Sequence, residues 1–197
     1  MTNSADTLAL LQRALDQTAT IIAAIRPDQL GLPTPCVGWD VRELMRHVVV
    51  KDLRNFIVSA QGETADWQAP ADELPADWTV VFRERADELL DIWRAADLDR
   101  PVIVPGGREA PLRSRVDHQI TELAMHDWDL VRATGQDYSL DPEITAHALA
   151  WSQQMLRPEA RGAGKAFGEE VAVPADAAAE DRLAGWFGRD PAWQPPR

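Results

Sequence analysis

Apolar residues recur at steps of three and four over most of this 197-residue chain, and this spacing constrains its fold more than any other feature. The pattern runs through four long stretches, residues 4–25, 40–60, 77–96 and 114–134, and a shorter fifth one, residues 141–156. Such spacing places apolar side chains on one face of an α-helix. We therefore expect amphipathic helices that bury their apolar faces against one another.

Residues typical of helix ends mark the boundaries of these stretches. Pro27 ends the first helix, because the residue before a proline is disfavoured in the helical conformation. Asp40 is a typical N-cap, and Glu43 three residues later completes a capping box. Gly135 follows the fourth stretch as a natural helix terminator, and Pro142 suits the first turn of the fifth helix.

The segments between the helices predict smaller features. Residues 99–113 have short β-branched runs around Gly106-Gly107, which predicts a small hairpin or extended loop whose prolines confine it to an edge. After a Gly-rich link at residues 161–168, we expect a short strand, Glu170–Val173, and a final short helix, residues 177–187.

Four long helices with one long connection favour a mostly α fold, a four-helix bundle with a hairpin-like insertion and a small C-terminal strand/helix extension. We expect residues 1–160 to form the bundle, and residues 161–197 to pack on it without forming an independent domain.

Composition excludes several functions. The formal net charge of −12 and the pI near 4.7 argue against nucleic acid and against anionic membrane surfaces, because both repel an acidic surface. No basic segment precedes an apolar run at the start of the chain, and no stretch approaches the roughly 18 apolar residues of a membrane span. We therefore expect a cytoplasmic protein, a monomer or homodimer.

The counts of cysteine and histidine narrow the choice of metal site. Cys36 is the only cysteine, which excludes an internal disulfide and a zinc site built mainly from thiolates. A metal ion must therefore be held by carboxylates and by members of a set of four histidines, namely His47, His118, His126 and His147.

Glu122 and His126 stand at positions i and i+4 of the fourth helix, so their side chains share one face. The apolar face of the second helix centres near Val48 and Asp52, and at about 100° per residue His47 falls to its side. Glu122 and His126 are rotated away from their own apolar face in the same sense. From this pattern alone we favour three solvated side chains on the flanks of their helices, and the alternative is a metal site in a cleft beside the core.

The remaining candidates are weaker. His118, one turn before Glu122, is a fourth ligand, a supporting group or, as we favour, a surface residue; His147 is an ordinary packing histidine. Asp129 either orients His126 or is an exposed carboxylate. Asp127 lies near the middle of an apolar face and needs a partner, which the sequence does not name. Cys36 lacks a nearby histidine base and is better explained as a buried structural residue.

Three stretches resemble the mycothiol-dependent maleylpyruvate isomerase N-terminal family of the DinB-like superfamily, in an actinobacterial subgroup. The first is Pro33-Thr-Pro-Cys-Val-Gly-Trp-Asp-Val-Arg-Glu-Leu-Met-Arg-His47, and the second is Glu122-Leu-Ala-Met-His126-Asp-Trp-Asp-Leu-Val-Arg-Ala-Thr-Gly135. The third comprises Phe167 to Val173, Asp181-Arg-Leu-Ala and Gly188-Arg-Asp-Pro-Ala-Trp193.

The resemblance implies a DinB-like four-helix bundle that holds zinc or nickel through His47, Glu122 and His126. It also implies mycothiol, a low-molecular-weight thiol, as cosubstrate. Asp127 departs from the small residue expected there, and the tail lacks the full C-terminal domain of the true isomerases. We expect a metal-dependent thiol transferase or isomerase acting on a small electrophile, with no further catalytic residue identified. The alternatives are a hydrolase using metal-bound water and a non-catalytic metal-binding or stress-related protein.

Overall fold

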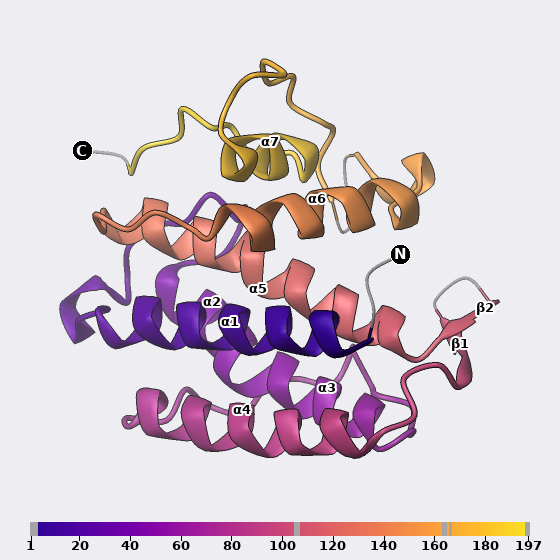
Figure 1. Cartoon of the computed structure of the whole chain (residues 1–197). Coiled ribbons are helices and arrows are strands. Elements are labelled where there is room, and N and C mark those ends of the chain that lie inside the picture. Colours follow the sequence, from indigo (N-terminus) through magenta and orange to yellow (C-terminus); the bar gives the residue numbers. More distant parts are fainter. Residues whose placement is uncertain (1–3, 105–106, 163–164, 166, 196–197) are drawn as a thin grey trace.

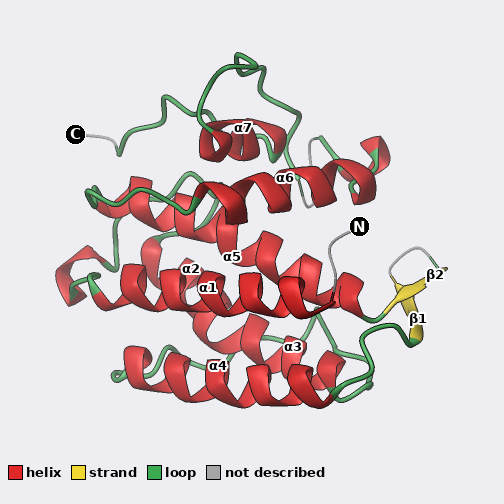
Figure 2. Cartoon of the chain, viewed as in Figure 1, coloured by secondary structure: helices red, strands yellow, loops and turns green. Residues whose placement is uncertain are grey.

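The protein is mostly helical, as the apolar spacing predicts, with a small two-stranded sheet at one end (Figures 1 and 2). The computed structural model describes residues 4–104, 107–162, 165 and 167–195. In chain order its main elements are α1 (Ser4–Ala23), α2 (Val41–Arg46), a π-helical turn (His47–Asp52), α3 (Leu53–Ala60), α4 (Trp78–Ala95), β1 (Pro101–Val104), β2 (Arg108–Pro111), α5 (Arg113–Thr134), α6 (Pro142–Met155) and α7 (Ala179–Trp186).

The long helices contact one another around a single core. α1 packs along α5 and also against α4, and α4 in turn packs against α3 (Figure 1). The largest buried side chains are aromatic and come from α3, α4 and α5, namely Phe56, Phe82, Trp93 and Trp128. The apolar faces read from the sequence are therefore buried together.

The structure confirms the helix ends that were predicted at Asp40, Gly135 and Asp141. The Asp40 carboxylate accepts a hydrogen bond from the Glu43 backbone N–H at 2.8 Å, and the Glu43 side chain returns to the Asp40 N–H. Gly135 adopts the left-handed conformation, with φ of 65°, and ends α5. Asp141 caps α6 by accepting from the Glu143 N–H at 2.9 Å.

The second predicted helix contains a feature that the spacing did not predict. Between α2 and α3, residues His47–Asp52 form a π-helical turn, in which backbone hydrogen bonds run from i to i+5. Residues five apart therefore lie on one face here, whereas in an α-helix they would diverge by about 140°. This turn brings His47 and Asp52 together.

The predicted hairpin is confirmed in its strands. β1 and β2 pair antiparallel, with Pro101 opposite Pro111 and Val104 opposite Arg108. Gly106, which the sequence places at the turn, lies outside the described residues, and Gly107 has a φ of 74°.

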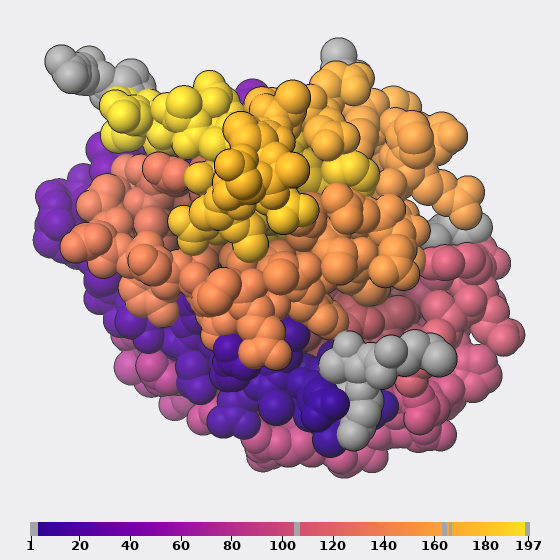
Figure 3. All heavy atoms as spheres, turned by 45° about the horizontal axis from the view of Figure 1, so that its top comes forward, coloured from indigo at the N-terminus to yellow at the C-terminus, as the bar shows by residue number. Residues whose placement is uncertain are grey.

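The C-terminal segment lies on the helices rather than apart from them. α7 packs against α6 and α5, and in the space-filling view its residues join α6 in one continuous surface (Figure 3). The predicted strand Glu170–Val173 is wrong. The segment forms no strand: the Val171 N–H donates one hydrogen bond to the Gly185 carbonyl at 2.9 Å, whereas a strand requires a paired ladder.

In the described part of the chain, no helix combines the length and the apolar character needed to cross a membrane.

Candidate metal centre

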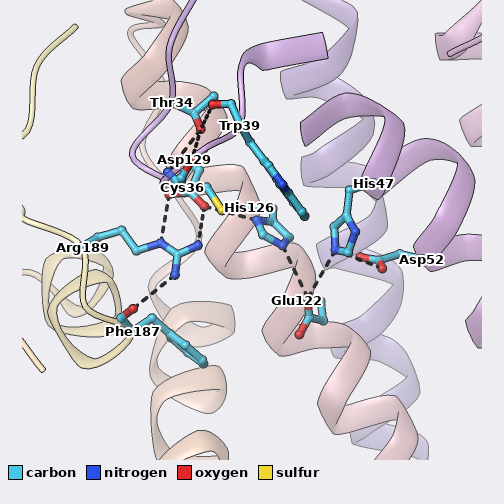
Figure 4. Close-up of polar contacts among 10 residues, drawn as sticks. All are labelled: Thr34, Cys36, Trp39, His47, Asp52, Glu122, His126, Asp129, Phe187 and Arg189. Atoms are coloured by element: carbon cyan, nitrogen blue, oxygen red, sulfur yellow. Dashed lines mark hydrogen bonds and ion pairs between the residues drawn. The ribbon is translucent and has the colours of Figure 1, made fainter. Parts of the chain in front are cut away.

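The structure brings His47, Glu122 and His126 together from two helical segments that are far apart in the sequence (Figure 4). One nitrogen of each imidazole and one carboxylate oxygen lie within 4.8 Å of one another. Glu122 Oε2 is 3.4 Å from His126 Nε2 and 3.8 Å from His47 Nε2. The three side chains are only partly accessible, with exposed fractions of 16%, 21% and 8% for His47, Glu122 and His126.

These donors fit a divalent metal ion in chemistry and approximately in spacing. Two imidazoles and one carboxylate are common zinc ligands, and bonds of about 2.0–2.2 Å place tetrahedral ligand atoms about 3.3 Å apart. The separations from Glu122 Oε2, 3.4 Å and 3.8 Å, are close to that value. The widest separation in the set is up to 4.8 Å, so an ion would draw the ligand atoms closer together by up to about 1.5 Å.

His126 is oriented from behind by Asp129. Its Nδ1 lies 3.2 Å from Asp129 Oδ2, and the carboxylate is fully buried. Since a carboxylate accepts, Nδ1 carries a hydrogen, and Nε2, which faces Glu122, is the nitrogen that would bind a metal ion. Burial alone would lower the pKa of His126, but Asp129 and Glu122 raise it to about 9.

Asp129 in turn is held by Arg189 of the C-terminal segment. Arg189 donates through Nη2 to Oδ2 at 3.0 Å and through Nε to Oδ1 at 3.2 Å. Only 10% of the arginine side chain is exposed, so this two-point ion pair is largely shielded from solvent. The sequence indicated Asp129 but did not indicate Arg189, because no spacing rule connects residues sixty positions apart.

Asp52 also lies at the site, although the sequence did not assign it there. Its Oδ1 lies 3.2 Å from His47 Nε2, yet this buried oxygen has no hydrogen-bond partner of good geometry among the described residues. Burial raises its pKa to about 7. A charged residue at the centre of an apolar helix face was the signal that could have found it.

Glu122 is surrounded by histidines. Burial would raise its pKa, but contacts with His118, His126 and His47 hold it well below the ordinary value. The prediction that His118 is a surface residue is wrong, since its Nε2 lies 3.3 Å from Glu122 Oε1 and its side chain is 27% exposed. Its ring stacks on Trp151 at 5.8 Å and 20°.

Trp39 lies against the imidazoles of His47 and His126, the two candidate histidine ligands. Its ring centroid is 4.8 Å from that of His47 and 6.0 Å from that of His126 (Figure 4). The loop before α2 places it there, because Thr34 Oγ1 donates to the Trp39 carbonyl at 2.9 Å and closes the turn. The tryptophan therefore limits access of water to the ligand atoms.

Two cavities that share lining residues open at this site, as expected for ligands beside the core. One, of about 430 Å³, is bordered by Cys36, Trp39, His47, His126 and Arg189; we call it the Trp39 cavity. The other, of about 260 Å³, includes Val104, Arg115, Trp151 and Met155; we call it the Arg115 cavity. Both include His118 and Glu122.

The other sequence candidates lie elsewhere or are inert. His147 Nε2 pairs with Asp117 at 2.9 Å, away from the three ligands. Asp127 is fully buried. Its partners, which the sequence did not identify, are Gln17 and Thr18, and they donate hydrogen bonds to its carboxylate at 2.9 Å and 3.0 Å. Burial raises the pKa of Cys36 to about 11, which leaves little thiolate at neutral pH.

Comparisons with known proteins agree with the resemblance. The family model described as the mycothiol maleylpyruvate isomerase N-terminal domain matches residues 11–131. An uncharacterised protein found in two strains of Mycobacterium tuberculosis is 34% identical over 195 residues, which covers 93% of this chain and 98% of that protein.

Solved structures show the same fold. The crystal structure of the mycothiol-dependent maleylpyruvate isomerase aligns with a TM-score of 0.59 and 17% identity, covering 76% of this chain and 68% of that chain. A histidine-to-alanine variant of that enzyme aligns with a TM-score of 0.57 and 16% identity. From its sequence match over most of the helical region, this chain belongs to the mycothiol maleylpyruvate isomerase N-terminal domain family.

Proposed function

We propose that this protein binds one divalent metal ion through His47, Glu122 and His126, and that it catalyses thiol transfer to, or thiol-assisted isomerisation of, a small electrophile. The observation that carries the proposal is the convergence of these three ligand atoms within 4.8 Å. Zinc suits the donor set, and so does nickel. Three protein ligands leave a coordination position for a substrate group.

Mycothiol is the proposed thiol because related proteins of this fold are named for their dependence on it. A bound divalent cation would favour the thiolate form, which is the nucleophile. The thiolate sulfur then bonds to an electrophilic carbon of an unsaturated substrate as its C=C π bond breaks, and the adjacent carbon takes up the proton that the S–H group released. In the isomerisation the addition reverses after bond rotation: the adjacent carbon loses a proton, the C–S bond breaks and the thiol is regenerated.

The protein's own residues support this chemistry by holding and shielding the ligands. Asp129 orients the His126 ring through Nδ1, so that Nε2 lies 3.4 Å from Glu122 Oε2 and is the nitrogen that would bind the metal. Trp39 lies against the imidazole rings of His47 and His126, and Asp52 Oδ1 lies 3.2 Å from His47 Nε2, the nitrogen that also faces Glu122. Cys36 is a poor alternative nucleophile because burial raises its pKa to about 11.

Thiol consumption with a panel of α,β-unsaturated carbonyl compounds tests the proposal. The metal-loaded protein should either consume mycothiol or isomerise a compound of the panel in its presence, the chelated protein should do neither, and metal should restore turnover. His126→Ala should abolish turnover, whereas His147→Ala, which alters a histidine outside the ligand set, should retain it.

The other functions give different results in the same assay. Turnover without added thiol would indicate a metal hydrolase that uses bound water. Stoichiometric metal binding with no turnover across the panel would indicate a non-catalytic metal-binding protein.

A further inference from the structure

The Arg115 cavity extends from Glu122 along α5 toward the hairpin. Among the α5 residues that line it, Glu122, His118 and Arg115 follow one face of the helix, and Val104 of β1 also borders the cavity. Arg115 and Glu122 are seven positions apart on the helix, which corresponds to about 10 Å along the axis. The cavity is therefore elongated, with a candidate metal ligand at one end and an arginine at the other.

Between these ends the wall is mainly apolar. Trp151, Met155 and Leu156 contribute from the end of α6, and Phe167 and Phe187 contribute from the C-terminal segment. Together they form a lining that favours hydrocarbon over a polar or hydrated group.

At the far end, two polar groups have incomplete partners within the described structure. Arg115 donates through Nη2 to the Ile103 carbonyl at 3.1 Å and pairs with no carboxylate among the residues that the structure describes. The undescribed positions contain no aspartate or glutamate. Ser114, only 8% exposed, also lines the cavity, and its buried hydroxyl has no hydrogen-bond partner in the described structure.

A half-buried cation beside an unpartnered hydroxyl favours an anion. Burial lowers the pKa of Arg115, but the guanidinium remains charged at neutral pH. Its planar fork suits a carboxylate, to which the Ser114 hydroxyl can also donate.

We propose that the Arg115 cavity binds an amphipathic monocarboxylic acid, with its carboxylate at Arg115 and Ser114 and its apolar chain extending toward Glu122. A span of about 10 Å corresponds to an extended chain of about eight carbon atoms. That this ligand is the electrophilic substrate, with its reactive carbon near Glu122, rests on the proposed function; the binding itself does not.

Binding of unreactive acids to the full-length protein tests the proposal. Butanoate, hexanoate and octanoate are titrated by calorimetry and by tryptophan fluorescence, since Trp151 lines the cavity. Affinity should rise about fourfold for each added methylene. The uncharged octanamide should bind at least tenfold more weakly than octanoate.

Variants locate the carboxylate. Arg115→Met should lower the affinity for octanoate at least tenfold and change the affinity for octanamide by no more than twofold. Ser114→Ala should lower the affinity for octanoate about threefold. Arg113→Met is the matched control, because this arginine lies on the same helix but pairs with Asp99, and it should leave octanoate binding unchanged. Each variant is first checked for native circular dichroism.

A carboxylate can also bind a metal ion, so every titration is repeated on chelated protein. Octanoate binding that survives chelation and depends on Arg115 supports the proposal. The proposal is overturned if octanoate binding disappears on chelation, if it is unchanged in Arg115→Met, or if affinity does not depend on chain length. Absence of thiol turnover would contradict the proposed function without changing these binding results, so the two failures are distinguishable.

Discussion

Arg189 and Asp129 form a two-point ion pair, at 3.0 Å and 3.2 Å, that joins the C-terminal segment to α5 three residues from His126. The same carboxylate lies 3.2 Å from His126 Nδ1. The orientation of a candidate metal ligand therefore depends on a residue that follows α7. This relationship gives the C-terminal segment a role in the site besides covering the helices.

Arg189→Met should weaken metal binding and lower stability together. Loss of the guanidinium leaves Asp129 buried without its counterion, which typically costs about 3–5 kcal/mol, and groups behind a metal ligand typically change affinity about 10–100-fold. Competition with a chelator measures the metal affinity, and urea unfolding measures the free energy of unfolding.

Arg132→Met provides the control for that experiment. Arg132 pairs with Asp181 of α7 at 3.0 Å and so also connects α5 to the C-terminal segment, but its side chain is 36% exposed. Its loss should cost less than about 1 kcal/mol and leave metal affinity unchanged. Equal metal affinity in wild type and Arg189→Met would show that the arginine does not support the site.

Cys36 should behave as an unreactive thiol. Because burial raises its pKa to about 11, alkylation by iodoacetamide at pH 7.5 should be much slower than for free cysteine, and it should accelerate on unfolding in urea. The Cys36→Ala variant should still require added thiol for turnover. Rapid labelling of the folded protein, or thiol-independent turnover that Cys36→Ala abolishes, would identify Cys36 as the nucleophile instead.

Asp141 should make stability depend on acidic pH. Burial would raise its pKa, but hydrogen bonds from Arg13 and the α6 backbone lower it. A lowered pKa in the folded state stabilises the protein above the unfolded value of about 4, and this contribution disappears as pH falls through the folded value. Because Arg13 is 47% exposed, the effect of the pair should not exceed about 1 kcal/mol.

Two substitutions separate the ion pair from the helix cap. Asp141→Asn keeps an effective N-cap but loses the charge, so it should flatten the stability profile between about pH 5 and pH 3. Asp141→Ala should cost about 1 kcal/mol more, because the cap to the Glu143 N–H is lost as well. An unchanged profile in Asp141→Asn would show that this carboxylate does not carry the dependence.

The helices could be predicted because their apolar faces and their caps are local signals. Asp40 with Glu43, and Gly135 after α5, lie within a few residues of the ends that they mark, and the structure confirms them. The strand at Glu170–Val173 was not correctly predicted, because a β-branched sequence forms a strand only where another backbone offers a ladder of partners.

The site could be predicted only in part, for a geometric reason. Glu122 and His126 share a helix turn, so local spacing indicates them, and the family motif indicates His47. The π-helical turn that aligns His47 with Asp52 left little trace beyond three successive valines, residues 48–50. Arg189 and the aromatic contacts of His118 depend on packing between distant segments, which the apolar spacing does not encode.

Elemental analysis of the purified protein is the most direct test of the central claim that His47, Glu122 and His126 share one divalent ion. The wild-type protein, after dialysis against trace metal, should hold one equivalent of zinc or nickel per chain, as should His147→Ala. His126→Ala, with circular dichroism unchanged, should hold less than about a tenth of an equivalent, since two remaining ligands bind weakly. A wild-type protein without stoichiometric metal, or a His126→Ala variant that retains it, would contradict the account.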